Sequence, residues 1–330
     1  MTAKNNAFFE DKQWLLDTPK VIRQQAAFEA AKNFKSAFSA KRNGTVDHFQ
    51  VQFKSKRTKG YVLGIEKQLT FTAAANDGRG SLVVLPESIG AVRFFEKPPI
   101  DTKPGGDCSV MRDAFGDFWL LVPVRKAVKQ RQSDDVLSID PGIRQPFSCF
   151  SPTRCEAFFE GGDMKQRIDD IQRRVQRVDV RLATPSADKK KLKAYRQRLF
   201  RRYKNVRDDC HWKIISSMTD SYGTILLPEL AVQRISGSLR AKSNREMFGI
   251  SHYLFRQRMA EKCQEKSVVF QVANEAYTSK TCGRCGHQND SLGSSEVFWC
   301  PRCGLHCHRD LHAARNIYIR WLAEQPSMAS

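Results

Sequence analysis

Four cysteines near the C-terminal end of the chain form two pairs with Cys-x2-Cys spacing: Cys282, Cys285, Cys300 and Cys303. Two thiolates separated by two residues can bind one face of a tetrahedral Zn²⁺ ion, and a second pair closes the other face. Each pair is followed directly by a glycine, Gly286 or Gly304, which lets the backbone turn its amides toward the sulfur atoms. The spacing therefore predicts a zinc ribbon.

The other six cysteines carry a weaker signal. Five of them are expected to pack as small hydrophobic residues: Cys108, Cys149, Cys155, Cys210 and Cys263. Cys307 is a further candidate ligand, but a closed structural site takes four ligands, so we expect it to be a bystander. A disulfide framework is the weaker alternative, because the chain starts without an apolar signal segment and is expected to be intracellular.

The charge of the chain predicts a polyanionic partner. The 55 Lys and Arg residues exceed the 35 Asp and Glu residues, which gives a formal net charge of +20. Such an excess attracts phosphate backbones in a salt-dependent way. The alternative is a solvated helix face or a nuclear import cluster. The excess is concentrated between residues 165 and 213, where we select as candidate nucleic-acid-binding residues Arg173, Arg174, Arg177, Lys190, Arg198, Arg201 and Arg202.

The length and hydrophobic content allow a sizeable core. A chain of 330 residues with 41% hydrophobic residues predicts two or three domains. No apolar run approaches the roughly 20 residues that a membrane span needs, so no membrane partner is expected.

The first third of the sequence predicts one helix followed by short strands. Residues 19–40 have apolar side chains at helical spacing, which we expect to face a core. Short alternating segments, separated by Gly, Pro and Asp clusters, predict a small β-barrel or sheet. The segments are residues 48–54, 61–66, 81–85, 91–96 and 118–124.

Acidic residues follow three predicted buried strands and begin a final helix. The strands are residues 136–139, 224–227 and 267–272, and a further strand is predicted at 147–150. The carboxylates at these places are Asp140, Glu229, Glu275 and Asp310. Three or four carboxylates in one pocket can hold two Mg²⁺ or Mn²⁺ ions, the usual machinery for attack of water on a phosphodiester.

Two long basic segments lie between the first and second of these strands. Residues 164–183 and 187–219 have helical character and are separated by Thr184, Pro185 and Ser186. They predict a helical hairpin with a cationic side.

Several ordered motifs resemble one family. They are Ser-Ile-Asp-Pro-Gly (138–142), Asp-Cys-His-Trp-Lys-Ile (209–214), Ile-Leu-Leu-Pro-Glu-Leu (225–230), Tyr-Thr-Ser-Lys-Thr-Cys (277–282) and Arg-Asp-Leu-His-Ala-Ala-Arg-Asn-Ile (309–317). Over about residues 118 to 320 the chain resembles the TnpB proteins of bacterial insertion sequences and their eukaryotic and viral relatives, the Fanzor proteins. These are RNA-guided DNA endonucleases related to the type V CRISPR effectors.

The resemblance implies an α/β multidomain protein. Its central part would be a RuvC-type, RNase H-like nuclease domain with an inserted zinc ribbon that binds the target nucleic acid. A small β-barrel wedge domain and a helical recognition segment would precede it. The implied boundaries are 1–48 for the helical segment, 49–130 for the wedge domain, 131–277 for the nuclease domain with its hairpin at 164–219, 278–307 for the ribbon, 308–323 for the last nuclease helix and 324–330 for the tail.

The resemblance also implies the catalytic residues. Asp140 and Asp310 match the first and last RuvC aspartates, whereas the place of the middle glutamate is taken by Pro228. Glu229 comes one residue late, and one residue along a strand reverses the face of the side chain. In some relatives a glutamate before the Tyr-Thr-Ser-Lys-Thr-Cys motif replaces the lost one, and Glu275 fits that place. We therefore predict Asp140, Glu275 and Asp310 as ligands of Mg²⁺ or Mn²⁺, with Glu229 as the alternative.

The implied partners are a guide RNA, double-stranded target DNA and the displaced single strand. The protein would form a ribonucleoprotein with its guide RNA as a monomer or as a dimer. Arg309 and Arg315 are candidate phosphate contacts. The implied location is the cytoplasm of a prokaryote, or the nucleus if the host is eukaryotic or the source viral. Two alternatives stay open: an RNA-guided DNA-binding repressor impaired in catalysis by Pro228, and a guide-independent RNase H-like nuclease.

Overall fold

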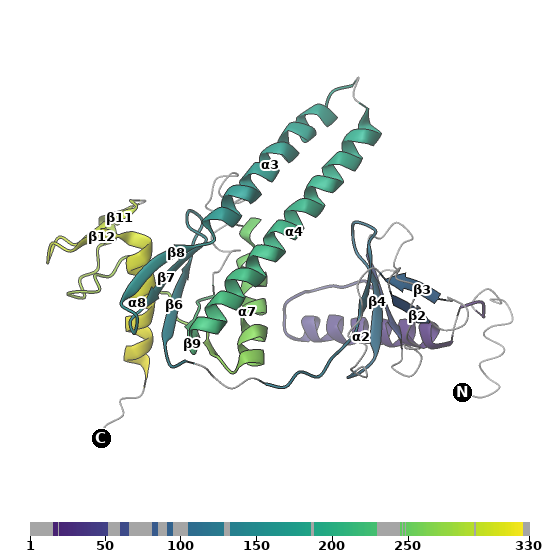
Figure 1. Cartoon of the computed structure of the whole chain (residues 1–330), viewed down its shortest axis with the longest axis horizontal. Helices are drawn as coiled ribbons and strands as arrows, with labels where there is room; N and C mark the ends of the chain where they lie inside the picture. The colour runs from purple at the N-terminus through teal and green to yellow at the C-terminus, as the bar shows by residue number, and fades with distance from the viewer. Residues whose placement is uncertain are drawn as a thin grey trace. The chain divides into compact units, whose positions relative to one another are not determined.

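The structure is a computed structural model that divides into two compact units, Met1–Lys126 and Ala127–Ser330. It describes residues 16–18, 20–51, 60–65, 81–84, 91–94, 105–128, 133–185, 188–229, 245, 247, 249–293 and 295–325. Figure 1 labels the elements of both units. In these ranges, no helix combines the length and the apolar character that crossing a membrane requires.

The first unit contains helix α2 (Lys20–Arg42) and two antiparallel sheets. The larger sheet has the order β1-β4-β5, and the smaller one pairs β2 with β3. The strand bounds are Tyr61–Ile65 for β1, Ser81–Val84 for β2, Ala91–Phe94 for β3, Cys108–Arg112 for β4 and Phe118–Leu121 for β5. The described strands thus lie in two separate sheets, which agrees with the sheet alternative of the prediction, and the barrel that the resemblance implies stays a prediction.

Most of the predicted elements of this unit are present. The helix predicted at 19–40 and four of the predicted strands agree with the structure to within a few residues. The strand predicted at 48–54 is wrong for residues 48–51, which are not in a strand, and its other residues lie outside the described ranges. Strand β4 was not predicted.

The expectation that the apolar side of α2 faces a core is wrong. Phe34 and Phe38 are 46% and 57% exposed, and Ala26 and Ala30 are exposed as well. The contact of this helix with the sheet is instead made by the side chain of Gln25, which lies against Gly64 of β1. Apolar spacing predicts which face of a helix can be buried, but burial also requires a partner.

The second unit is built on a five-stranded sheet with the order β10-β9-β6-β7-β8. Strands β6, β7 and β8 are antiparallel neighbours, whereas β9 and β10 run parallel to β6. The bounds are Val136–Pro141 for β6, Phe147–Ser151 for β7, Glu156–Glu160 for β8, Thr224–Leu226 for β9 and Val269–Gln271 for β10. Parallel neighbours need long crossover connections. These contain α3 (Gly162–Leu182) and α4 (Lys189–Ser221) before β9, and α7 (His252–Lys266) before β10.

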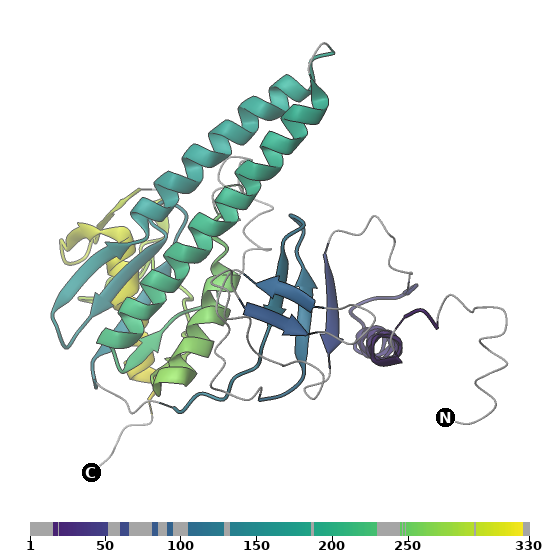
Figure 2. The same cartoon turned by 45° about the vertical axis from the view of Figure 1, so that its right-hand side comes forward.

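Helices cover both faces of this sheet (Figures 1 and 2). Successive side chains of a strand point to opposite faces. In β6, Leu137 and Ile139 are fully buried in a core that includes residues of α3, α4 and α7. The Ser138 hydroxyl instead donates to the carbonyl of Ala314 in helix α8 (Arg309–Glu324), at 2.8 Å. Asp140, two residues after Ser138, therefore lies on the face that α8 covers.

A long helical hairpin extends from the sheet, as predicted (Figures 1 and 2). It consists of α3 (Gly162–Leu182) and α4 (Lys189–Ser221), and each predicted helix agrees with the structure to within a few residues. The buried residues of α3 recur every three or four positions, which gives the helix one apolar side, and the other positions hold mainly basic, acidic and amide side chains. They are Met164, Ile168, Ile171, Val175 and Val178.

Candidate carboxylate site and cysteine cluster

Asp140 stands at the centre of the candidate site, near the end of β6 and opposite Ser148 of β7. Burial raises the pKa of the Asp140 carboxyl well above its usual range, and the negative charges of Asp310 and Glu275 raise it further, against the opposing charge of Arg309. The structure thus brings Asp310 and Glu275 close enough to Asp140 for their charges to act on its carboxyl. Crowded carboxylates of this kind are typical of functional sites.

Asp310 and Glu275 are placed by local backbone structure. Asp310 lies in the first turn of α8, and its amide donates to Nδ1 of the capping residue His308 at 3.3 Å. Glu275 follows β10, and its carbonyl accepts hydrogen bonds from the amide and the hydroxyl of Thr278, at 3.2 and 2.8 Å. Burial also raises the pKa of the Glu275 carboxyl.

Glu229, the alternative third carboxylate, points elsewhere. Ser138 pairs with Leu226, so Pro228 follows at the level of Asp140 and Glu229 one residue beyond. The Glu229 side chain is 67% exposed and forms a 2.6 Å salt bridge with Arg256 of α7, whose hydrogen bond lowers the pKa of the Glu229 carboxyl. Since α7 and α8 cover opposite faces of the sheet, this carboxylate belongs to the opposite side from Asp140.

The three carboxylates are neighbours without forming a tight ligand set. In the part of the chain that the structure describes, only the four cysteines form a group of three or more potential metal ligands with all ligand atoms within 4.8 Å of one another. Beside Asp140, the buried hydroxyl of Ser148 has no hydrogen-bond partner. A polar occupant of this site would satisfy that hydroxyl.

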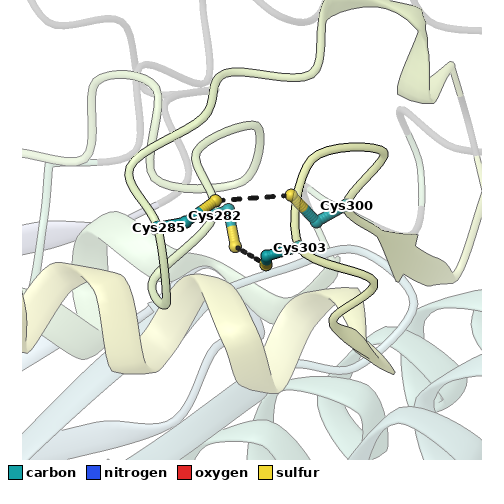
Figure 3. A group of neighbouring side chains, drawn as sticks. All are labelled: Cys282, Cys285, Cys300 and Cys303. Atoms are coloured by element: carbon teal, nitrogen blue, oxygen red, sulfur yellow. Dashed lines mark hydrogen bonds between the residues drawn. The ribbon is translucent and has the colours of Figure 1, made fainter.

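The four predicted cysteines form a cluster that could hold a metal ion (Figure 3). The Sγ atoms of Cys282 and Cys303 are 3.6 Å apart, as are those of Cys285 and Cys300. Zinc–sulfur bonds of 2.3 Å in a tetrahedron place the sulfur atoms about 3.8 Å apart. The sulfur spacing therefore suits a tetrahedral metal.

The glycines after the two cysteine pairs make the predicted turns. Gly286 and Gly304 have φ values of 73° and 70°, a region that favours glycine. Their amides donate to the carbonyls of Cys282 and Cys300, each at 2.9 Å. Strands β11 (Val297–Trp299) and β12 (His306–His308) complete the small ribbon around these turns.

The remaining cysteines follow the expectations with one exception. Cys307 lies on β12 outside the group of four, and burial raises the pKa of its thiol. The predicted core cysteines are buried except for Cys155, for which the prediction is wrong. Cys155 lies in an exposed turn with φ of 51°, which follows β7 at the surface.

Helix α8 is joined to the cysteine loop by side chains whose role the sequence did not indicate. The Asn316 amide nitrogen donates to the carbonyls of Thr278 and Thr281, at 2.8 and 2.7 Å. The amide of Gly283 lies 3.1 Å from Nε2 of His312, and a side chain at Gly283 would overlap Asn316. These residues belong to quoted motifs, but only the tertiary structure shows that they join the segment that carries Glu275 to the helix that carries Asp310.

The predicted nucleic-acid-binding residues fall into two groups. On the hairpin, Arg201 is partly buried, and the other six residues are exposed. The exposed residues are Arg173, Arg174, Arg177, Lys190, Arg198 and Arg202. Arg309 instead donates to the carbonyls of Gly293 and Ser295, and Arg315 donates to the carbonyl of Gly283 at 3.2 Å. Both α8 arginines thus have a structural role within the ribbon, and their phosphate contacts stay a prediction.

We expect Asn316→Ala to lower the unfolding free energy by about 1–3 kcal/mol, because it leaves the buried carbonyl of Thr278 without its donor. Thermal and denaturant unfolding measure the change. The control Gln264→Ala removes an exposed amide from α7 and should change stability little. Equal stability of both variants would contradict the role of Asn316.

A family model described as "Cas12f1-like, TNB domain" matches residues 252–317. This range includes α7, Glu275, the ribbon and the first half of α8.

Relatives of known sequence extend the similarity to nearly the whole chain. The chain is 45% identical over 325 residues to the "Putative transposase A625R" of Paramecium bursaria Chlorella virus 1, a match that covers 97% of this chain and 73% of the relative. It is 27% identical over 209 residues to the "TnpB-like protein L79" of Acanthamoeba polyphaga mimivirus, which covers 61% of this chain and 40% of the relative. It therefore spans less than half the length of that mimivirus protein.

Solved structures are similar at low sequence identity. The "Cas12f1-sgRNA-target DNA complex" matches with a TM-score of 0.45 and 15% identity, over 81% of this chain and 63% of that chain. The "mini-RNA-guided endonuclease CRISPR-Cas_phi3" matches with a TM-score of 0.40 and 14% identity, over 64% and 51%.

Proposed function

Because the chain belongs to the TnpB family, we propose that it is an RNA-guided DNA endonuclease that hydrolyses phosphodiester bonds of target DNA. The observation that carries the proposal is the position of Asp140 on the face of the sheet that α8 covers, where the charges of Asp310 and Glu275 both act on its carboxyl. TnpB proteins act with a guide RNA, as the family resemblance implies. Substrate and partner are therefore proposed from the family, and the reactive site from the geometry.

We assign β6 to β10 and α8 to a RuvC-type, RNase H-like nuclease domain. The support is the strand order, in which three antiparallel strands are continued by two strands parallel to the first. The hairpin of α3 and α4 is an insertion between β8 and β9, and the ribbon is an insertion before α8.

The carboxylate site fits divalent cations. Mg²⁺ and Mn²⁺ prefer oxygen ligands, and Asp140, Glu275 and Asp310 would supply them. Burial and the negative charges of Asp310 and Glu275 raise the pKa of Asp140, and bound positive charge would favour its ionised form. When bound, two such ions activate water and stabilise the leaving oxygen of a phosphodiester. We propose no part for Glu229 in this site, since its side chain is paired with Arg256.

We propose Zn²⁺ as the metal of the cysteine cluster. Four thiolates with no open position are typical of structural zinc. With the metal bound, the four cysteines would order the loop from Cys282 to Cys303. We propose that this ribbon binds the target nucleic acid.

Guide RNA and target DNA are proposed to bind the first unit and the exposed basic side of the hairpin. The formal charge of +20 supports phosphate contacts, and such contacts hold a heteroduplex without selecting its sequence. Base pairing with the guide would select the target. We propose a monomeric ribonucleoprotein as the active form.

The proposal is tested by sequencing the RNA that purifies with the protein after a high-salt wash. We expect one enriched species with a constant scaffold and a variable end, because a structured guide makes more contacts than salt alone can disrupt. Heterogeneous RNA that the salt removes would contradict guidance and favour a guide-independent RNase H-like nuclease.

One observation favours a second candidate function. Pro228 occupies the level of Asp140 where relatives have a glutamate. A repressor that binds DNA through a guide without cutting it would tolerate this proline. Target binding without cleavage in Mg²⁺ or Mn²⁺ would identify the repressor.

A further inference from the structure

Tyr277 has an unusual combination of backbone conformation and exposure. It lies two residues after Glu275, its φ is 62°, and 63% of its surface is exposed. Residues with a Cβ rarely adopt this left-handed conformation, because the Cβ crowds the following carbonyl. Such conformations persist where the surrounding structure fixes them, and they cluster at functional sites.

Hydrogen bonds fix the backbone at Tyr277 on both sides. Its carbonyl accepts from the amides of Lys280 and Thr281, each at 3.0 Å, and from the Thr281 hydroxyl at 2.9 Å. The preceding carbonyl of Ala276 accepts from Arg320 of α8 at 2.7 Å. The position from which the aromatic ring projects is therefore fixed relative to the helix that begins with Asp310.

The ring itself is not needed for the core. Tyr277 is among the most exposed large hydrophobic residues described, and the hydrogen bonds of its turn use backbone atoms that any residue provides. An exposed aromatic ring on a rigid turn loses little entropy when it binds a partner. Aromatic side chains of this kind stack on the bases of single-stranded nucleic acids.

We propose that the ring of Tyr277 stacks on a nucleobase of the DNA strand that enters the carboxylate site, and so places that strand for cleavage. This inference rests on the proposed function. Two residues of extended chain span at most about 7 Å, so a base stacked on Tyr277 lies close to Glu275. The side chains of Lys280, in the same turn, and Arg320 of α8 form exposed ion pairs with Asp290 and Glu324, at 3.2 and 3.1 Å. Phosphates of that strand would compete with these carboxylates for the two cations.

The test measures DNA binding by the full chain with its bound RNA, in buffer without Mg²⁺ or Mn²⁺, so that no cleavage is needed. The probe is a single-stranded oligodeoxynucleotide that carries a fluorescent base analogue, whose emission falls when it stacks. We expect Tyr277→Phe to bind and quench like the unaltered protein. Tyr277→Ala should bind about 5- to 150-fold more weakly, without quenching.

Two further variants separate stacking from a structural role of the turn. Tyr277→Gly suits the φ of 62° and keeps the turn, so a stacking role predicts the same loss of binding as Tyr277→Ala. Tyr253→Ala removes a tyrosine of similar exposure, 61%, from α7 and should bind normally. Normal binding and quenching by Tyr277→Gly would overturn the inference.

The outcome is distinct from that of the proposed function. A protein that cuts guided targets but binds DNA equally well with and without the Tyr277 ring would overturn only this inference. A protein that never cuts DNA, but quenches the probe only when the ring is present, would overturn the nuclease and keep the stacking site.

Discussion

Glu275→Gln is expected to lower the rate of DNA cleavage by about 10³-fold or more while the protein keeps its fold and its RNA. Stabilisation of a phosphodiester transition state by divalent cations amounts to several kcal/mol, and each 1.36 kcal/mol is a tenfold change in rate. Glutamine keeps the size of the side chain but removes the negative charge that a hard cation prefers. Single-turnover cleavage of a guided target measures the loss.

The matched control is Glu229→Gln. Glu229 is exposed and paired with Arg256, so the loss of its charge should change the cleavage rate and the stability little. Full activity of Glu275→Gln, together with inactivity of Glu229→Gln, would transfer the third ligand to Glu229.

Stability provides a further check on the same variant. Burial raises the pKa of Asp140, the charges of Asp310 and Glu275 raise it further, and burial raises the pKa of Glu275 itself, so both carboxylates are harder to ionise in the folded protein. Their contribution to stability is therefore greatest at low pH and is lost as pH rises through the raised pKa values. Without divalent cations at neutral pH, Glu275→Gln should thus keep or raise the melting temperature. A clear fall would indicate that the variant is misfolded.

Cys300→Ser is expected to remove the metal and unfold the ribbon. Structural zinc in small domains contributes apparent binding energies of about 10–16 kcal/mol, and most of the ordering of such a loop depends on it. Cys300 is fully buried in the small ribbon core with Cys282 and Phe298. Metal analysis should show the loss of one zinc per chain. The thermal unfolding curve should lose the cooperative transition of the ribbon.

The control is Cys307→Ser, which alters the fifth cysteine of the ribbon outside the group of four. It should keep the zinc, because the closed site already has its ligands. Retention of zinc by Cys300→Ser, or its loss from Cys307→Ser, would contradict the assigned ligand set. We also expect Cys300→Ser to impair cleavage, since Arg315 and Asn316 join the cysteine loop to the helix that carries Asp310.

The sequence was most informative where the signal is local. Cysteine spacing predicted the cluster, and the strand before Asp140 and the two hairpin helices were found from apolar runs and helical periodicity. Strands β4 and β8 were missed. The strand β8 has adjacent Phe158 and Phe159 and lies at the sheet edge, so its sequence lacks the clear alternation of a half-buried strand.

Features that depend on distant partners could not be obtained from the sequence. The salt bridge of Glu229 joins a residue just after β9 to Arg256 of α7, and no local pattern indicates that pairing. The exposure of α2 depends on what packs against it. The link from Asn316 to Thr278 joins residues far apart in the chain, and neither residue type indicates it.

Retargeting of the ribonucleoprotein tests the central claim most directly. The variable end of its RNA is replaced by a new sequence, and the cut sites in a DNA library are sequenced after incubation with Mg²⁺. Our account predicts that cleavage moves to the DNA that matches the new RNA and disappears in the Glu275→Gln variant. Cuts that stay at the same positions, or that occur without RNA, would contradict it.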